Sequence, residues 1–299
     1  MMEAMIRKQT AKQARQLEDW LVKHDAAHPF PAEVELTADV AYAEDARPAH
    51  RMDIYRFRGS EGRRPVLVNF HGGGFLLGHK EANRLFCADL CQRGFLVFGV
   101  EYPLAPQASI FQILRDLTQA VEKAAELCPA YGGDPEQISL CGDSAGAYLC
   151  VYLAALQNST ALAKAAGIEP CRVPFRGLGL ISGMFYTRKP DSIGIFLPVQ
   201  IYGRGWRRHP FRPYMNPEHP EVIGHLPPTL LVTADGDFLR HYSRQYAAAL
   251  QRAGRPYRLI DIQGPKKLPH AFAAMLPELP ESQEANAAMA EFLRSTDRA

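Results

Sequence analysis

A serine lies between two glycines in the segment Gly142-Asp143-Ser144-Ala145-Gly146, after the apolar run 138–141 and before the apolar run 148–153. This pattern predicts a strand, a very tight turn and a helix. Such a turn holds the serine side chain out at the carboxyl end of the strand, and the glycines let the chain pass through a strained backbone. A serine held in this way is suited to nucleophilic attack on a carbonyl carbon. The pattern alone is a weak signal, so a second motif has to decide its meaning.

Three consecutive glycines follow the strand-like segment 65–70, in His71-Gly72-Gly73-Gly74-Phe75. Acyl transfer at a serine builds negative charge on the carbonyl oxygen, and each preorganised N–H donor there is worth about 2.7–4 kcal/mol of the barrier. Glycines after a strand let backbone N–H groups turn toward one point, unshielded by side chains. A glycine-rich turn without a chemical role is the alternative explanation. Together with the serine turn, an oxyanion hole is the stronger interpretation, with the N–H of Ala145 as a further donor.

An acid and a histidine follow in the chain order that this type of serine turn requires. The segment 229–234 is predicted to be a buried strand, and the loop after it carries Asp235 and Asp237. A last strand is predicted at 257–262, and His270 falls on the loop that follows it. The chain has ten histidines, and His270 is singled out by this position alone. The residues thus predict a triad of the serine, one of the two aspartates and this histidine.

The sequence resembles the bacterial hormone-sensitive-lipase-like esterases of the α/β-hydrolase superfamily. HGGGF at 71–75 and GDSAG at 142–146 carry the resemblance, and together they are highly specific for that family. Further matches extend it from about residue 36 to residue 293, and they are Tyr102–Pro106, Asp116, Tyr131–Pro135, Leu226–Pro228 and Asp237–Arg240.

The resemblance implies a role for each candidate residue. It favours Asp237 over Asp235 as the acid, because Asp237-Phe238-Leu239-Arg240 looks like the family's Asp-Pro-Leu-Arg, whose first residue is catalytic. Asp235 would then be a turn-forming side chain. The implied set is Ser144 as nucleophile, His270 as general base and Asp237 as acid, with Gly73, Gly74 and Ala145 lining the oxyanion hole. This mechanism requires no metal and no organic cofactor.

The sequence departs from the family pattern at three places, none of which removes a catalytic group. Pro103 and Gln107 stand where the family has an arginine and a glutamate, and His241 stands where it has a second aspartate. Ala271 replaces the glycine that usually follows the catalytic histidine. These changes bear on the usual supporting ion pairs and on the shape of the acyl pocket.

Alternating strands and helices predict an α/β-hydrolase fold, with a mostly parallel eight-stranded sheet and helices on both faces. The first two strands are expected to form an antiparallel pair. The predicted strands lie at 36–44, 50–57, 65–70, 95–101, 138–142, 176–182, 229–234 and 257–262, and the predicted helices at 81–93, 109–127, 145–157, 241–253 and 282–295.

Two segments do not fit this core, and we expect them to form a small helical cap over the site. The N-terminal segment 1–35 contains a predicted helix with one apolar stripe, which ends before Pro29. The other is an insertion at about 183–225 within the catalytic domain 36–299, and its length is typical of a lid. Its aromatic residues either pack the cap onto the core or contact substrate.

Basic residues gather in the second of these segments and near the histidine loop. One hypothesis is that these residues bind an acidic substrate. The simpler and favoured explanation is that they form a solvated lid surface. The residues are Arg204, Arg207, Arg208, His209, Arg212, Lys266 and Lys267.

Composition sets wider limits. The 299 residues fit one large domain, and a formal net charge of +2 argues against a dedicated nucleic-acid binder. There is no run of about 20 apolar residues and no apolar signal-peptide core, so we expect a cytoplasmic protein without a membrane span. The six cysteines are expected to be buried free thiols, although Cys87 and Cys91 at helical spacing could hold a metal or form a bridge.

The sequence therefore predicts a serine carboxylesterase that cleaves short- to medium-chain acyl esters of small molecules. An amidase or peptidase using the same triad is one alternative. A ligand-binding protein that has lost hydrolysis, as in the plant gibberellin receptors, is the other, and the intact triad argues against it. The resemblance allows a homodimer, although no residue pattern in the chain establishes one.

Overall fold

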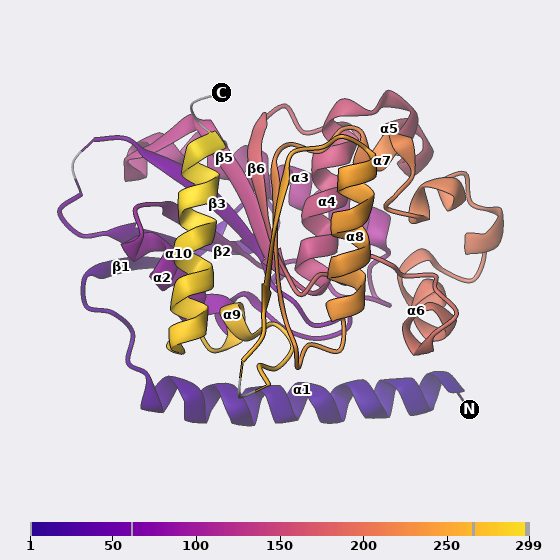
Figure 1. The fold of residues 1–299 in the computed structure, drawn as a ribbon, viewed down its shortest axis with the longest axis horizontal. Helices are drawn as coiled ribbons and strands as arrows, with labels where there is room; N and C mark the ends of the chain where they lie inside the picture. The colour runs from indigo at the N-terminus through magenta and orange to yellow at the C-terminus, as the bar shows by residue number, and fades with distance from the viewer. Residues whose placement is uncertain (1, 61, 265–266, 297–299) are drawn as a thin grey trace.

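An eight-stranded sheet forms the centre of the molecule in the computed structural model, which describes residues 2–60, 62–264 and 267–296 (Figure 1). The strand order is β1-β2-β4-β3-β5-β6-β7-β8; β2 pairs antiparallel with β1 and β4, and the other neighbours are parallel. The strands are β1 Val34–Ala41, β2 Arg51–Phe57, β3 Arg64–Phe70, β4 Leu96–Val100, β5 Gly133–Asp143, β6 Phe175–Ile181, β7 Thr229–Ala234 and β8 Tyr257–Ile262. The predicted α/β-hydrolase sheet is confirmed.

Helices cover both faces of this sheet. One apolar cluster joins it to α3, α4 and α8, and another joins it to α2, α9 and α10. The α-helices are α1 Met2–Ala27, α2 Arg84–Gln92, α3 Ile110–Leu127, α4 Ala145–Asn158, α5 Thr160–Ala166, α6 Ser192–Tyr202, α7 Pro220–Ile223, α8 Arg240–Arg252, α9 Phe272–Met275 and α10 Pro280–Ser295. The 3₁₀ helices are η1 Lys80–Asn83, η2 Cys128–Tyr131, η3 Trp206–Arg208 and η4 Arg212–Met215. No described helix is long and apolar enough to cross a membrane.

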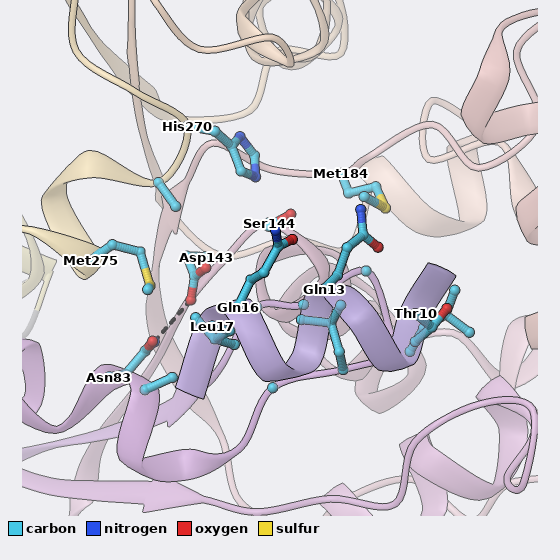
Figure 2. A pocket seen from close by; sticks show the side chains of 18 of the residues that line it. Thr10, Gln13, Gln16, Leu17, Asn83, Asp143, Ser144, Met184, His270 and Met275 are labelled. Atoms are coloured by element: carbon cyan, nitrogen blue, oxygen red, sulfur yellow. Dashed lines mark hydrogen bonds between the residues drawn. The ribbon is translucent and has the colours of Figure 1, made fainter. Parts of the chain in front are cut away.

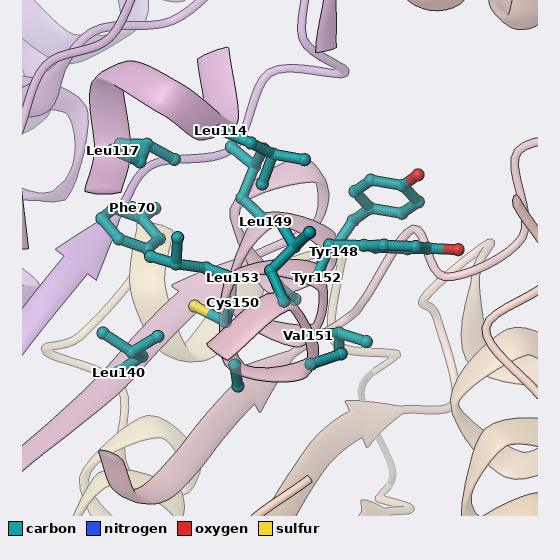
Figure 3. Packing of buried hydrophobic residues seen from close by; sticks show 14 of the residues in the cluster. Phe70, Leu114, Leu117, Leu140, Tyr148, Leu149, Cys150, Val151, Tyr152 and Leu153 are labelled. Carbon is teal, nitrogen blue, oxygen red and sulfur yellow. The ribbon is translucent and has the colours of Figure 1, made fainter. Parts of the chain in front are cut away.

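Helix α4 is the most deeply buried helix of the site. Its residues from Ala145 to Leu156 are all buried, as expected for a helix that is apolar on every side. Leu149 and Leu153 belong to the same cluster as Leu140 of β5 and Leu114 of α3 (Figure 3). This packing holds the first turn of α4 at a fixed place above the end of β5.

Helix α1 lies across the carboxyl-terminal edge of the sheet (Figure 1). It runs from Met2 to Ala27 and ends before Pro29, as predicted, but it begins well before the apolar stripe that starts at Leu17. Ion pairs hold it to the body of the protein, with Glu18 2.8 Å from His79 and Asp25 2.6 Å from Arg84.

Lys80 is a buried cation that joins η1 to β2. Its ammonium lies 2.9 Å from Asp53 and 3.0 Å from Asp39, and it also contacts Glu81. The side chains of Lys80 and Asp53 are 4% and 2% exposed. Burial raises the pKa of Asp53, although its hydrogen bonds from Asp39 and Lys80 oppose this effect.

We expect Lys80→Met to lower the free energy of unfolding by about 3–5 kcal/mol, because it leaves the Asp53 carboxylate buried without its cation. Urea denaturation of wild type and variant measures the difference. Adding Asp53→Asn to Lys80→Met removes the stranded charge and should restore most of the loss. A loss below about 1 kcal/mol in the single variant would contradict this account.

Candidate active site

Ser144 lies on the turn between β5 and α4, with φ 51° and ψ −110°. The turn packs against the end of β3: a Cβ added at Gly142 would lie 2.6 Å from the Phe70 carbonyl oxygen, and one at Gly146 would lie 1.9 Å from it. Both glycines are therefore required by the close approach of β3. The Ser144 amide also donates to the Ile181 carbonyl of β6 at 2.8 Å. The backbone around the serine is thus fixed by both neighbouring strands.

His270 and Asp237 form a close pair, with 2.7 Å between Nδ1 of the histidine and Oδ1 of the aspartate. Asp237 follows β7 and its side chain is fully buried, whereas the His270 side chain is 21% exposed. In Figure 2 the imidazole of His270 points toward Ser144. Its Nδ1 is held by the carboxylate, so Nε2 is the ring nitrogen left to face the pocket.

Asp237 accepts two further hydrogen bonds, from the Leu239 amide at 2.8 Å and the Thr233 hydroxyl at 2.8 Å. Burial alone would raise its pKa, but the bonds from His270, Leu239 and Thr233 hold the pKa below its ordinary value. The other candidate, Asp235, accepts the Leu268 amide at 3.4 Å instead. Of the two aspartates that the sequence left open, Asp237 is the one against the histidine.

The glycine motif forms a loop at one wall of the same pocket. Gly73 has φ 114° and Gly74 has φ 62°. A Cβ at Gly73 would lie 1.8 Å from the Leu77 carbonyl oxygen, so no other residue fits there without rearrangement. Ala145 is the first residue of α4, and N–H groups in the first turn of a helix have no acceptor within the helix. The positive end of the helix dipole therefore also points to this place.

A buried aspartate within the serine motif supports the glycine loop. Asp143 accepts a hydrogen bond from Asn83 Nδ2 at 2.8 Å, drawn in Figure 2. A Cβ at Gly72 would lie 2.1 Å from an Asp143 carboxylate oxygen. Burial raises the pKa of Asp143, while bonds from Asn83 and the Gly72 backbone lower it. Sequence reasoning missed Asn83, since it belongs to no motif and meets Asp143 only through the fold.

His71 connects the start of the glycine loop to the residues that follow β4. Its Nδ1 donates to the Gly72 carbonyl at 2.8 Å, and its Nε2 lies 3.3 Å from Glu101. The ring stacks on Tyr102 with centroids 4.2 Å apart, and the Tyr102 hydroxyl donates to the His71 carbonyl at 2.6 Å. His71, the first residue of the motif, thus has a structural function.

Ala271 occupies a backbone conformation that explains the glycine usual at this position. Its φ is 58°, in the left-handed region, and it is buried. Its amide donates to Ser182 Oγ at 3.0 Å, which fixes the chain directly after His270. The alanine therefore keeps the turn that a glycine would adopt with less strain.

The pocket above Ser144 has a volume of about 490 Å³. Of the predicted site residues, Ser144, His270, Gly73 and Gly74 line it, while Asp237 and Ala145 lie buried behind them. Figure 2 shows α1 across it, with Gln16 directed toward Ser144 and Gln13 toward Met184. The other lining residues are Thr10, Leu17, Gly72, Leu76, Leu77, Gly78, Ala82, Asn83, Asp143, Met184, Phe238, Ala271 and Met275.

The insertion 183–225 contributes Met184 to this pocket, and none of its aromatic side chains lines it; Phe196 is exposed, and others pack onto the core. Tyr202 shares a 2.6 Å hydrogen bond with Tyr148 of α4, and Phe211 makes an edge contact with Phe111 of α3. Of the two explanations left open for these aromatics, the structure favours packing onto the core.

The basic residues of that insertion lie away from the pocket. Arg207, for example, lies over the ring of Trp206, with 4.7 Å to the ring centroid. None of them lines the pocket, and neither does Lys267, while Lys266 lies outside the described residues. The acidic-substrate hypothesis receives no support from this placement.

The six cysteines are buried and free. Burial raises the pKa of Cys91 to about 12 and raises that of Cys87 well above its ordinary value. These thiols therefore stay protonated near neutral pH, and the metal or bridge considered for this pair is not favoured.

A sequence profile of the alpha/beta hydrolase fold matches residues 67–274, and the chain belongs to that family. An isoprenylcysteine alpha-carbonyl methylesterase of Arabidopsis thaliana is 28% identical over 232 residues, 73% of this chain and 53% of the relative. A versiconal hemiacetal acetate esterase of Dothistroma septosporum is 26% identical over 272 residues, 86% of this chain and 79% of the relative. The chain spans about half the length of the plant methylesterases it matches.

Solved structures agree in fold. Esterase B of Lactobacillus rhamnosis superimposes with a TM-score of 0.91 at 23% identity, over 100% of this chain and 97% of that one. An esterase of the bacterial hormone-sensitive lipase family gives a TM-score of 0.73 at 21% identity, over 96% and 91% of the two chains. The resemblance carried by HGGGF and GDSAG is confirmed.

Proposed function

We propose that this protein is a carboxylic ester hydrolase that acts on short- to medium-chain acyl esters of small molecules. The main support for the proposal is the hydrogen bond of 2.7 Å between His270 Nδ1 and Asp237 Oδ1, together with the position of His270 in the same pocket as Ser144 and the glycine loop. The two relatives named above are a methylesterase and an acetate esterase, which supports an ester with one small side. A homodimer and a cytoplasmic location stay predictions from the sequence.

The proposed reaction follows from these groups. His270 Nε2 takes the proton of Ser144 as the serine oxygen attacks the ester carbonyl carbon, and Asp237 stabilises the imidazolium that forms. The N–H groups of Gly73, Gly74 and Ala145 hold the oxyanion. The imidazolium then protonates the leaving alcohol, and water repeats the sequence on the acyl-enzyme to release the acid.

The walls of the pocket argue against an anionic substrate. Among the described residues that line it, Asp143 and His270 are the titratable ones, and no lysine or arginine is present. The remaining wall is largely apolar, with Leu76, Met184 and Phe238 among its members. An anionic acyl or alcohol group would lose its hydration there without gaining a lysine or arginine as a partner.

Hydrolysis of p-nitrophenyl esters from acetate to dodecanoate, beside the matching p-nitroanilides, tests the proposal. We expect ester turnover with a maximum at short or medium chains and far slower anilide turnover. Faster anilide than ester cleavage would support the amidase alternative. No turnover of any ester by folded protein would overturn the proposal and favour the alternative of a ligand-binding protein that has lost hydrolysis.

The two glutamines of α1 are expected to limit acyl length. Gln13 and Gln16 bring amide groups to the α1 side of the pocket, where Thr10 and Leu17 are the other lining residues. We expect the double variant Gln13→Leu/Gln16→Leu to raise kcat/KM for octanoate relative to butyrate by about fourfold or more, the value of one additional buried CH₂ group.

Gln9→Leu is the matched control, because Gln9 lies on the same helix and does not line the pocket. The control should leave the octanoate-to-butyrate ratio unchanged. An equal change in both variants would mean that α1 acts through general hydrophobicity and not through the pocket wall.

A further inference from the structure

Three side chains with metal-binding groups meet at the carboxyl-terminal end of α1. His24 lies on the last turn of α1, His28 follows just after it, and Glu278 precedes α10, whose first turn lies next to this end of α1 in Figure 1. Nε2 of His24 is 3.2 Å from Glu278 Oε2, and the two imidazole centroids are 4.5 Å apart. One ligand atom from each of the three residues lies within 4.8 Å of the others.

We propose that His24, His28 and Glu278 bind a divalent transition-metal ion of the Zn²⁺ type, which fastens α1 to the segment before α10. Zn²⁺ takes imidazole nitrogen and carboxylate oxygen at about 2.0–2.2 Å in a tetrahedral arrangement, so its ligand atoms are roughly 3.4 Å apart. The 3.2 Å between His24 and Glu278 already fits this spacing. The site is separate from the pocket and does not depend on the proposed ester hydrolysis.

The hydrogen bonds of His28 leave the nitrogen that a metal needs. Its Nδ1 lies 2.9 Å from the His24 carbonyl oxygen. A carbonyl oxygen only accepts, so Nδ1 carries the proton and the Nε2 lone pair is available. Metal-bound histidines in proteins nearly always have their other ring nitrogen held in this way.

The His24 ring is also held in place. It stacks on Trp20 with centroids 4.6 Å apart, and its side chain is 8% exposed. The neighbouring Asp25 is engaged by Arg84 at 2.6 Å, which fixes this end of α1 without the ion. The Glu278 side chain is 29% exposed, so one side of the site is open to solvent, and a water molecule can occupy the fourth coordination position.

His79 shows why a histidine beside carboxylates is not by itself such a site. Its two ring nitrogens both lie 2.8 Å from a carboxylate, of Glu18 and of Glu81. Among the described residues, His79, Glu18 and Glu81 do not form a cluster whose ligand atoms all lie within 4.8 Å of one another. The pair of histidines four residues apart is what distinguishes the end of α1.

Titration of the chelator-treated full chain with ZnCl₂ in a calorimeter tests the proposal. We expect one ion per chain and a rise in Tm of several degrees with excess Zn²⁺. His28→Ala and the near-isosteric Glu278→Gln should each weaken binding at least tenfold and remove the rise in Tm. Circular dichroism before titration confirms that both variants are folded.

Two further variants locate the ion. His225→Ala removes a histidine that pairs with Glu221 four residues away but belongs to no three-ligand cluster among the described residues, and this variant should bind Zn²⁺ like wild type. His270→Ala should also bind normally, since its imidazole belongs to the pocket. No binding up to about 1 mM Zn²⁺, unchanged affinity in His28→Ala and Glu278→Gln, or loss of binding in His270→Ala would each overturn the proposal.

Amide hydrogen exchange tests the consequence for α1. Zn²⁺ should slow exchange in the last turns of α1 in wild type and leave it unchanged in Glu278→Gln. Equal exchange with and without Zn²⁺ in wild type would show that the ion does not fasten the helix.

Discussion

Replacing Ser144 by alanine is expected to lower kcat for the best p-nitrophenyl ester by about 10⁶-fold, the loss typical when a serine hydrolase loses its nucleophile. The reason is chemical and not structural: Ser144 is the hydroxyl that meets His270 and the glycine loop at the pocket. Alanine keeps the backbone turn between β5 and α4 and removes only the oxygen. Steady-state hydrolysis corrected for the uncatalysed rate measures the loss.

Ser182→Ala is the control for this variant. Ser182 is also buried, close to the site and at positive φ, but its hydroxyl accepts the Ala271 amide. We expect its loss to cost no more than about tenfold, through the position of His270. A burst of p-nitrophenol and a mass increase equal to the acyl group should occur in wild type and in Ser182→Ala only. More than 1% of wild-type turnover in Ser144→Ala would mean that another group attacks the ester.

The sheet and the residues at its carboxyl edge could be predicted because their determinants are local. A strand buried on both faces, such as β3, carries a short apolar run in the sequence, here 66–68. The close approach of the β3 backbone requires glycine at positions 142 and 146, so this packing is visible in the sequence as the two glycines around Ser144. The order of acid and histidine then follows from the strands that precede them.

The remainder of the pocket depends on contacts that no local pattern records. The sequence predicted that the segment 1–35 caps the site, but nothing in it singled out Gln13 and Gln16 as the side chains that reach the pocket. Asn83 reaches Asp143 across 60 residues. The residue pattern alone left Asp235 and Asp237 open, since both follow β7, and only the family resemblance favoured Asp237; the structure places Asp237 against His270.

Asp237→Ala is expected to lower kcat by about 10⁴-fold, because His270 then loses both the partner that orients it and the charge that stabilises its imidazolium form. Asp235→Ala should change kcat by less than about tenfold, since that carboxylate bonds the Leu268 amide and does not contact the imidazole. The ester that gives the highest turnover in wild type serves for all variants. Equal losses in the two alanine variants would contradict the assignment of Asp237.

Asp237→Asn separates the two effects of the carboxylate. Oδ1 accepts both the Leu239 amide and His270, whereas Oδ2 accepts the Thr233 hydroxyl, which can rotate to become an acceptor. The oxygen of an asparagine should therefore stay at the Oδ1 position, with its NH₂ group toward Thr233. His270 would keep its proton on Nδ1 and lose only the neighbouring charge. We therefore expect kcat at least tenfold above that of Asp237→Ala; an asparagine variant as slow as the alanine variant would mean that the charge, and not the orientation of the ring, supplies nearly the whole effect.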